Sequence, residues 1–267
     1  GPFNGTVTTV TIPADSSTVS FYYKDPVAGT PLLRVSSVGL TDGTQQETIT
    51  WGAVSLLQLS TTPTTLTAGA SSSAILLKTF NAYGIQVPVS GSYQVTLIST
   101  HSPTGKFDIS DNGSFDGSIT QVTVPDAADN AVFYYKDTLA GSVTLTSSHS
   151  GVTPGTLNMN IDPATGIKIA YTTSPQTLQI GQKSTPITIQ VRDTYNNPTV
   201  ISSTTIDLST NSPTGVFLNA SNQTITDVAI TSSADFYYQD FTVGSPTVTA
   251  AVSGFSPITQ QETINEG

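Results

Sequence analysis

The chain has 267 residues, of which 36% are hydrophobic and only 10% charged, and its formal net charge at pH 7 is -10. This acidic balance excludes a nucleic-acid partner bound through a basic face, and the lack of any run of about 18 to 20 apolar residues argues against membrane insertion within this segment. Because cysteine is absent, disulfides, thiolate nucleophiles and sulfur-ligated metals are excluded as well, which favours a prokaryotic surface protein.

Residues 1–50 are predicted to form the C-terminal half of a β-sandwich repeat. Their segment Phe-Tyr-Tyr-Lys-Asp at 21–25 recurs at 133–137 and, with one change, at 236–240, and the string Gln-Gln-Glu-Thr-Ile at 45–49 returns at 260–264. A sandwich that lacks strands exposes unpaired edges and part of an apolar core. We therefore expect either a trimmed unit or one completed by strands from another chain or the adjacent domain.

Residues 51–161 are predicted to form a complete β-sandwich. Short segments such as 93–97 alternate in polarity and are rich in Thr, Val, Ile and Tyr, as half-buried strands are. Clusters of Gly, Pro, Asn and Asp separate these segments, and no window shows the stripe of an amphipathic helix. About seven to nine strands of this kind are typical of an immunoglobulin-like sandwich.

Residues 162–267 are predicted to be a second complete sandwich in tandem with the first. The string Ser-Pro-Thr-Gly at 102–105 returns at 212–215. Four further positions recur in the same order. Pro63, Gly69, Asn81 and Tyr83 correspond to Pro175, Gly181, Asp193 and Tyr195, respectively. The fold class is therefore all-β, with tandem immunoglobulin-like domains joined by short linkers.

The repeated aromatic segment can be oriented from its variation. Successive strand residues face opposite sides, so the charged Asp235 places Tyr237 toward solvent and Phe236 and Tyr238 toward the core. The same register predicts four further inward residues, Phe21, Tyr23, Phe133 and Tyr135, and two outward ones, Tyr22 and Tyr134. We expect each inward tyrosine hydroxyl to bond to a backbone carbonyl at a corner of the sandwich.

The third repeat carries a family resemblance. Its strand at 187–191, the turn from Arg192 to Pro198 and the late aromatic strand at 235–238 resemble the prokaryotic Ig-like repeats of the invasin/intimin and bacterial Ig-like families. The middle repeat departs from this pattern, with Asn81 to Ile85 at the turn. The resemblance implies extracellular, cell-surface arrays, as in adhesins and S-layer proteins, in which such domains serve as stalk or contact modules.

Candidate chemistry is sparse, and no catalytic residues are predicted. The two histidines, His101 and His149, are expected to be solvated rather than to join a catalytic set. An acidic insertion that the third repeat lacks contains Asp108, Asp111, Asn112 and Asp116. Their oxygens suit Ca²⁺, but the same residue types form ordinary turns, and the turn interpretation is favoured. No other cofactor is expected.

Several exposed residues are candidates for surface contacts. The outward tyrosines Tyr22, Tyr134 and Tyr237 recur once per unit, and Trp51 lies at the first junction. They could contact a glycan or a partner protein, although cross-strand pairing for the tyrosines and packing between domains for Trp51 are the favoured interpretations. Lys24 and Lys136 are expected to be solvated rather than part of an isopeptide bond. Sequons mark four candidate glycosylation sites, Asn4, Asn112, Asn219 and Asn222.

These patterns favour a non-catalytic structural or adhesive module of a prokaryotic extracellular protein. The expected partners are neighbouring Ig-like domains of the same protein or further copies of the chain, with a cell-surface or glycan ligand as an additional candidate. Two alternatives stay open. One is a carbohydrate-binding accessory region of a secreted enzyme, and the other is a filament or layer subunit assembled by strand complementation.

Overall fold

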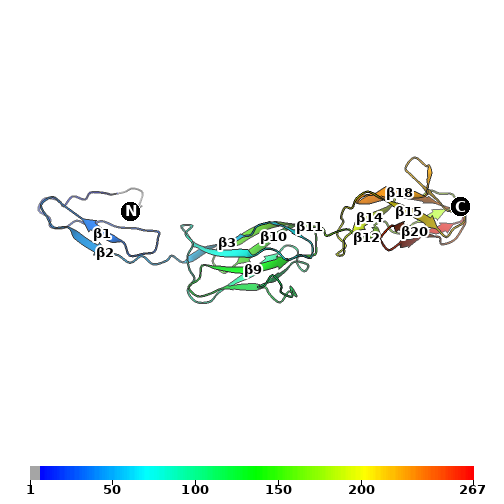
Figure 1. Cartoon of the computed structure of the whole chain (residues 1–267). Coiled ribbons are helices and arrows are strands. Elements are labelled where there is room, and N and C mark those ends of the chain that lie inside the picture. Colours follow the sequence, from blue (N-terminus) through cyan, green and yellow to red (C-terminus); the bar gives the residue numbers. More distant parts are fainter. Residues whose placement is uncertain (1–6) are drawn as a thin grey trace.

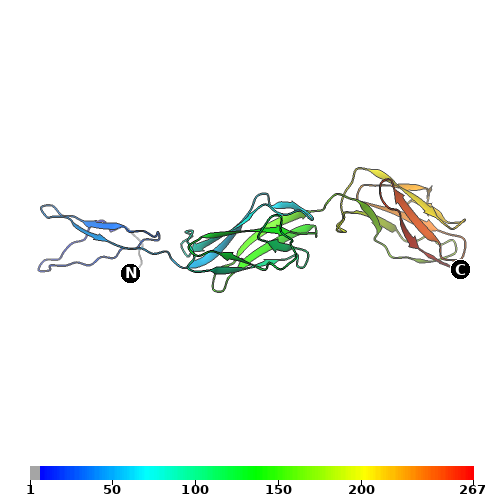
Figure 2. The same cartoon turned by 60° about the horizontal axis from the view of Figure 1, so that its bottom comes forward.

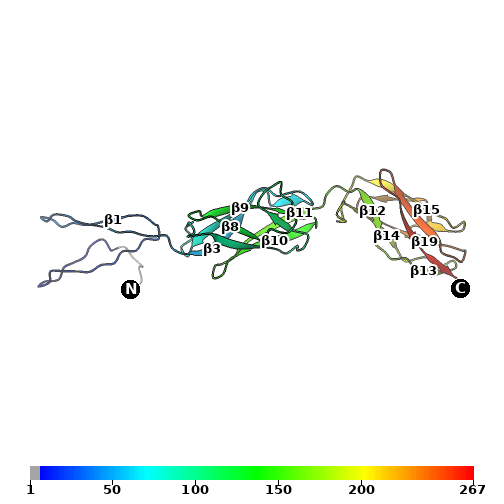
Figure 3. The ribbon, with the colours of Figure 1, turned by 90° about the horizontal axis from the view of Figure 1, so that it is seen from below.

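A computed structural model describes residues 7–267, and every regular element in this range is a β-strand. The all-β class predicted from the sequence is therefore confirmed. Three units follow one another along the chain, and they stay separate in all three views (Figures 1, 2 and 3). No helix able to cross a bilayer occurs in the described range.

The first unit is a single hairpin with long flanking segments. Strand β1 (Leu32–Val35) pairs antiparallel with β2 (Gly43–Gln46), and a bridge joins Gly29 to Ile49. The side chains of Phe21 and Tyr23 are 48% and 42% exposed. The prediction that these two rings point into a core is wrong for this unit, because no second sheet within residues 7–50 covers them.

The middle unit is a sandwich of two sheets (Figure 1). One sheet has the order β3 (Val54–Ser60), β5 (Ile75–Asn81), β9 (Asn130–Lys136) and β7 (Lys106–Asp108). The other has the order β4 (Thr65–Thr67), β11 (Gly155–Asp162), β10 (Gly141–Ser148), β6 (Tyr93–Ser99) and β8 (Gln121–Val124). Strands β4 and β11 are parallel, whereas the other pairs are antiparallel. This arrangement is that of an immunoglobulin-like sandwich.

The third unit repeats the arrangement. One sheet has the order β12 (Lys168–Tyr171), β14 (Ile187–Arg192), β19 (Ser233–Gln239), β16 (Val216–Leu218) and β17 (Thr224–Ile225). The facing sheet has the order β18 (Asp227–Ile230), β15 (Thr204–Thr210), β20 (Thr247–Val252) and β21 (Ile258–Gln261). A parallel pair, β13 (Thr177–Gln179) with β22 (Thr263–Asn265), corresponds to β4 with β11.

Each sandwich has its own core, and the two cores share no residue. Phe133 and Tyr135 are fully buried in the middle core, as are Phe236 and Tyr238 in the third, so their predicted inward direction is confirmed. In the middle core the ring of Phe107 meets that of Phe133 edge-on at 5.8 Å. An equivalent pair in the third core meets at 5.7 Å. Burial of these rings together with the aliphatic side chains of both sheets stabilises each unit.

The turn named in the family resemblance forms in both complete units. In the third unit Asp193 Oδ1 accepts the N–H groups of Tyr195 and Asn197, each at 2.8 Å. In the middle unit Asn81 Oδ1 accepts the N–H groups of Tyr83 and Ile85 in the same way. Asn81 therefore replaces Asp193 without loss of the turn, because both side chains present an acceptor oxygen to the same two donors.

Candidate functional site

A buried tyrosine and aspartate meet at the end of β9 in the middle unit. The Tyr135 hydroxyl donates to Asp137 Oδ2 at 2.7 Å and lies 2.7 Å from Ser99 Oγ. Burial raises the pKa of the Tyr135 hydroxyl, and the neighbouring Asp137 raises it further, although the Ser99 hydrogen bond acts in the opposite direction. The phenol therefore stays protonated. The predicted partner, a backbone carbonyl, is wrong: the partner is the aspartate two residues later.

The third unit builds the same pair with different neighbours. The Tyr238 hydroxyl donates to Asp240 Oδ2 at 2.6 Å, while the hydroxyls of Thr214 and Ser212 donate to Asp240 Oδ1 at 2.6 and 2.9 Å. Burial opposes ionisation of this carboxyl. The hydrogen bonds from Thr214, Tyr238, Ser212 and the Thr242 N–H outweigh burial, so the pKa of Asp240 is lower than its ordinary value.

His101 is a direct partner of the buried aspartate in the middle unit. Its Nδ1 lies 2.8 Å from Asp137 Oδ2, and its side chain is only 14% exposed. The expectation that His101 is solvated is therefore wrong. Ser212 takes the corresponding place in the third unit, since it also bonds to the aspartate of the pair. Ser99 is hydrogen-bonded to Tyr135 and not to the imidazole, so these groups do not form a nucleophile and base pair.

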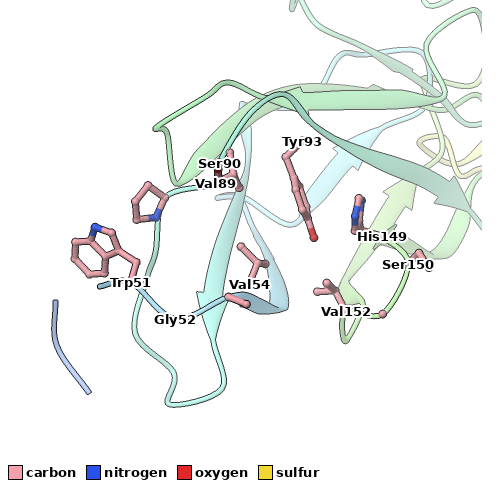
Figure 4. Close-up of a pocket in the computed structure, with 12 residues that line it drawn as sticks. Trp51, Gly52, Val54, Val89, Ser90, Tyr93, His149, Ser150 and Val152 are labelled. Carbon is pink, nitrogen blue, oxygen red and sulfur yellow. The ribbon is translucent and has the colours of Figure 1, made fainter. Parts of the chain in front are cut away.

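An open hollow of about 370 Å³ lies at the end of the middle unit that faces the first unit (Figure 4). Trp51, 49% exposed, lines one side, and Tyr93 and His149 line another with their ring centroids 3.9 Å apart. His149 Nδ1 lies 2.8 Å from the Gln94 carbonyl oxygen, so His149 is not freely solvated as predicted. The buried Tyr93 hydroxyl has no partner in residues 7–267, and burial raises its pKa.

The acidic side chains of the insertion accept hydrogen bonds from neighbouring residues of the same turn. Asp108 accepts the N–H groups of Ser110 and Phe115, both at 3.1 Å. Asp111 accepts the side-chain amide of Asn112, and Asp116 accepts the N–H of Ser118 at 2.8 Å. No group of three acidic or histidine side chains suited to a metal ion occurs in residues 7–267. The structure thus gives the four calcium candidates hydrogen-bonding roles in the turn.

The other candidate surface residues lie apart from one another. Tyr22 is 84% exposed, whereas Tyr134 and Tyr237 are half-buried. Lys183 Nζ lies 3.8 Å from the centroid of the Tyr237 ring, so this tyrosine already has a cationic neighbour. Lys136 Nζ lies 5.7 Å from the centroid of the Phe115 ring.

The sequons differ in accessibility. Asn112 and Asn222 are exposed, and Asn219 is half-buried with its side-chain oxygen bonded to the N–H of Ser221 at 2.9 Å. Asn4 lies outside the described residues.

A hairpin joins the third unit to the middle unit. We call residues 193–198 the junction hairpin. Asn197, only 4% exposed, donates from Nδ2 to the Thr138 carbonyl at 2.8 Å and accepts the Ala140 N–H on Oδ1 at 2.9 Å. Its Nδ2 also bonds to Asp193 Oδ2 at 2.8 Å, which holds the amide in place. One side chain therefore makes two hydrogen bonds across the boundary between units.

Tyr195 of the junction hairpin packs on a glycine of the middle unit. A Cβ on Gly69 would lie 2.0 Å from the Tyr195 Oη, so the ring requires a residue without a side chain there. Gly69 also has a φ of +83°, which favours glycine. Residues 193–198 were recognised in the sequence as a turn, but their contact with a loop 59 residues away was missed, because no local pattern encodes it.

Comparisons with known proteins give only distant similarities. No family model matches the chain, and no curated protein matches it. Domains 4 and 5 of the S-layer protein SbsC align with 79% of this chain and 98% of their own, at 16% identity and a TM-score of 0.30. The adhesin InvE of Yersinia pseudotuberculosis aligns with 78% of this chain and 58% of its own, at 18% identity and 0.33. A glycosyl hydrolase family 2 member from Bacteroides cellulosilyticus aligns with 74% and 23%, at 14% identity and 0.35. These values are too low to indicate a function.

Proposed function

We propose that the chain is a non-catalytic structural module of a prokaryotic extracellular or cell-surface protein, in which sandwich units hold one another at a fixed distance and angle. The observation that carries this proposal is the Asn197 bridge. Its amide bonds to a carbonyl and an N–H of the preceding unit while it is itself nearly fully buried. An amide used in this way orients a junction rather than merely tethering two domains.

The composition of the chain agrees with this role. Two separate cores without cysteine, and a net charge of -10, suit an exposed array whose units fold independently. The buried Tyr135 and Asp137 pair braces the loop that receives Asn197, because Asp137 directly precedes Thr138. The function of the module is then geometric: it sets how far and in which direction an attached domain projects.

The junction can be tested with two spin labels, which the absence of native cysteine makes straightforward. We would label Thr156→Cys on β11 and Thr205→Cys on β15, both exposed, and measure the distance distribution by pulsed electron paramagnetic resonance. We expect a narrow distribution that broadens in Asn197→Ala. Asn130→Ala, an exposed amide remote from the junction, is the matched control and should leave the distribution narrow. A broad distribution in the unaltered chain would overturn the proposal.

A second candidate function is carbohydrate binding, and the hollow in Figure 4 favours it. The exposed ring of Trp51 gives this hollow one aromatic face of the kind on which sugar rings stack, and Tyr93 and His149, stacked on each other, line another side. Glycan-array binding that is lost in Trp51→Ala and kept in Tyr134→Ala would place a sugar at this hollow. Loss in Tyr134→Ala alone would place it on the outward sheet face, and no binding by the unaltered chain would exclude this candidate.

A further inference from the structure

The far end of the third unit reproduces the surface on which the junction hairpin sits. In the middle unit this acceptor face consists of Gly69 and the loop from Thr138 to Gly141. The Gly69 N–H donates to the Asp137 carbonyl at 2.7 Å, which fixes the two parts together. By register, the third unit has Gly181 and the loop from Phe241 to Gly244 at the same place.

The two acceptor faces agree in backbone geometry. The Gly181 N–H donates to the Asp240 carbonyl at 2.8 Å, and the φ of Gly181 is +75°, close to the +83° of Gly69. Gly244 bridges to Ile264, as Gly141 pairs with Ile161 in the middle unit. The groups that correspond to the Thr138 carbonyl and the Ala140 N–H are therefore the Phe241 carbonyl and the Val243 N–H.

These corresponding groups are unoccupied in the third unit. Within residues 7–267 neither the Phe241 carbonyl nor the Val243 N–H makes a hydrogen bond. The side chains of Phe241 and Val243 are 53% and 48% exposed, and both lie in the loop that follows β19. Exposed apolar groups beside free backbone groups form a surface suited to a protein partner.

We propose that this end is an acceptor face for the junction hairpin of a further sandwich unit of the same kind. The inference rests on the proposed function and adds the identity of the partner. Both hydrogen bonds from Asn197 to the acceptor involve main-chain atoms, so they stay available where Phe241 replaces Thr138 and Val243 replaces Ala140. The Phe241 ring lies over Gly181, 3.3 Å from where a Cβ would be, in the place that Tyr195 takes over Gly69, so it has to turn aside when the incoming tyrosine binds.

The sequence of the hairpin decides which unit fits. The equivalent hairpin of the middle unit has Ile85 where the third unit has Asn197, so it presents no amide to the acceptor groups. The partner is thus a unit whose hairpin carries both the tyrosine and the asparagine of residues 193–198. The simplest probe is a second copy of the third unit. Its Pro163 would directly follow Asn265, just as Pro163 follows Asp162 in the chain itself.

The test is hydrogen exchange by NMR on a lengthened chain, in which residues 1–265 are followed by a second copy of 163–267. The Ala140 N–H, bonded to Asn197, is an internal standard for an occupied acceptor face. We expect the Val243 N–H to exchange about fivefold more slowly in the lengthened chain than in the original one. Asn197→Ala in the attached copy alone should abolish this protection and leave that of Ala140 unchanged.

A second pair of variants controls for local strain. Gly181→Ala places a Cβ on the acceptor face, whereas Gly254→Ala introduces the same positive φ strain, at +87°, with no atom within 4 Å. We expect only Gly181→Ala to remove protection of Val243. Equal exchange of Val243 in the original and lengthened chains, with Ala140 protected, would overturn this inference alone. An unprotected Ala140 in the original chain would instead overturn the proposed function.

Discussion

At the residue scale, the aspartates Asp137 and Asp240 occupy equivalent buried positions in the two sandwiches. Both are fully buried, and a buried carboxylate is tolerated only when donors surround it. Each unit supplies a tyrosine hydroxyl from two residues earlier, but the remaining donors differ, with His101 in one unit and Ser212 and Thr214 in the other. The aspartate and its tyrosine thus form the constant part of the cluster.

Removal of the tyrosine hydroxyl should destabilise the middle unit. Tyr135→Phe takes a donor from Asp137 and a partner from Ser99, and we expect it to lower the free energy of unfolding by about 1 to 3 kcal/mol. Urea denaturation followed by circular dichroism measures this change. Tyr134→Phe, the half-buried neighbour on the same strand, is the control and should change stability by less than about 0.5 kcal/mol. Equal effects of the two substitutions would contradict the assignment.

Acid should destabilise the third unit through Asp240. Because the folded-state pKa of Asp240 lies below its ordinary value of 3.8, its ionised form stabilises the fold above about pH 4, and this contribution is lost as pH falls through the folded pKa. We expect urea midpoints that decline between about pH 4 and pH 2, and a shallower decline in Asp240→Asn, which is also less stable at pH 7.

The charge-matched control for this experiment is Asp207→Asn. Asp207 lies on the exposed side of β15, opposite Asp227 and away from the tyrosine, so its substitution removes a negative charge that is not part of the buried cluster. The interpretation fails if Asp207→Asn flattens the pH dependence as much as Asp240→Asn does.

The sequence predicted part of this cluster. Two-residue alternation correctly placed Phe133 and Tyr135 inward, because strand geometry is local. The tyrosine and its aspartate are two residues apart within the repeated Phe-Tyr-Tyr-Lys-Asp segment, so this pairing could have been read from the sequence. His101 could not, since it is 36 residues from Asp137 and only the closed sandwich brings them together.

At the element scale, the turn that contains Gly69 is the critical part of the junction. Gly69→Ala should displace Tyr195 and release the Ala140 N–H from Asn197, because the new Cβ would overlap the tyrosine ring. Gly151→Ala is the matched control, since Gly151 has a similar φ of +75° with no atom within 4 Å. Both substitutions carry the backbone cost of about 1 to 2 kcal/mol for a left-handed residue.

Hydrogen exchange distinguishes these two variants. We expect the Ala140 N–H to exchange about fivefold faster in Gly69→Ala and at the original rate in Gly151→Ala. The same acceleration in both would mean that backbone strain, and not contact with Tyr195, governs the junction.

The elements themselves were largely predictable, and the exceptions have a physical cause. Alternating polarity and turn residues predicted the strands of both complete units, because each strand packs its apolar side against a facing sheet. The same pattern misplaced Phe21 and Tyr23, since alternation shows which side of a strand is apolar but not whether anything covers it. Contacts between units leave no periodic signal, which is why the Asn197 bridge was missed.

At the scale of the whole molecule, the apolar side chains of the first unit are uncovered. Leu32, Leu40 and Val38 are 64%, 73% and 103% exposed, and no core residue in the described range precedes Leu57. We expect the chain to self-associate at high concentration through residues 7–50, and a shortened chain of residues 51–267 to remain monomeric with the same thermal midpoint. Light scattering and calorimetry measure the two properties. Equal association of both chains would show that the contact lies elsewhere.

The two junctions of the molecule are built differently. At the second, Asn197 bonds to two backbone groups of the neighbouring unit. At the first, the corresponding hairpin has Gly84 and Ile85, and Lys24 Nζ lies 5.1 Å from the centroid of the Tyr83 ring. Tyr83 is also more exposed than Tyr195, at 59% against 40%. The hairpin at the first junction therefore lacks the side-chain amide that makes the bridge at the second.

The hydrogen bonds of Asn197 have one consequence for how such a protein can change over time. Since the asparagine recognises main-chain atoms, the loop that receives it can mutate at Thr138, or at Ala140 to any residue except proline, without losing either hydrogen bond. Gene duplication can then add units that carry the asparagine of the junction hairpin, and each added unit meets a loop that offers the same two backbone groups. The number of such units could then change during evolution, while the angle set by the asparagine between successive units stays the same.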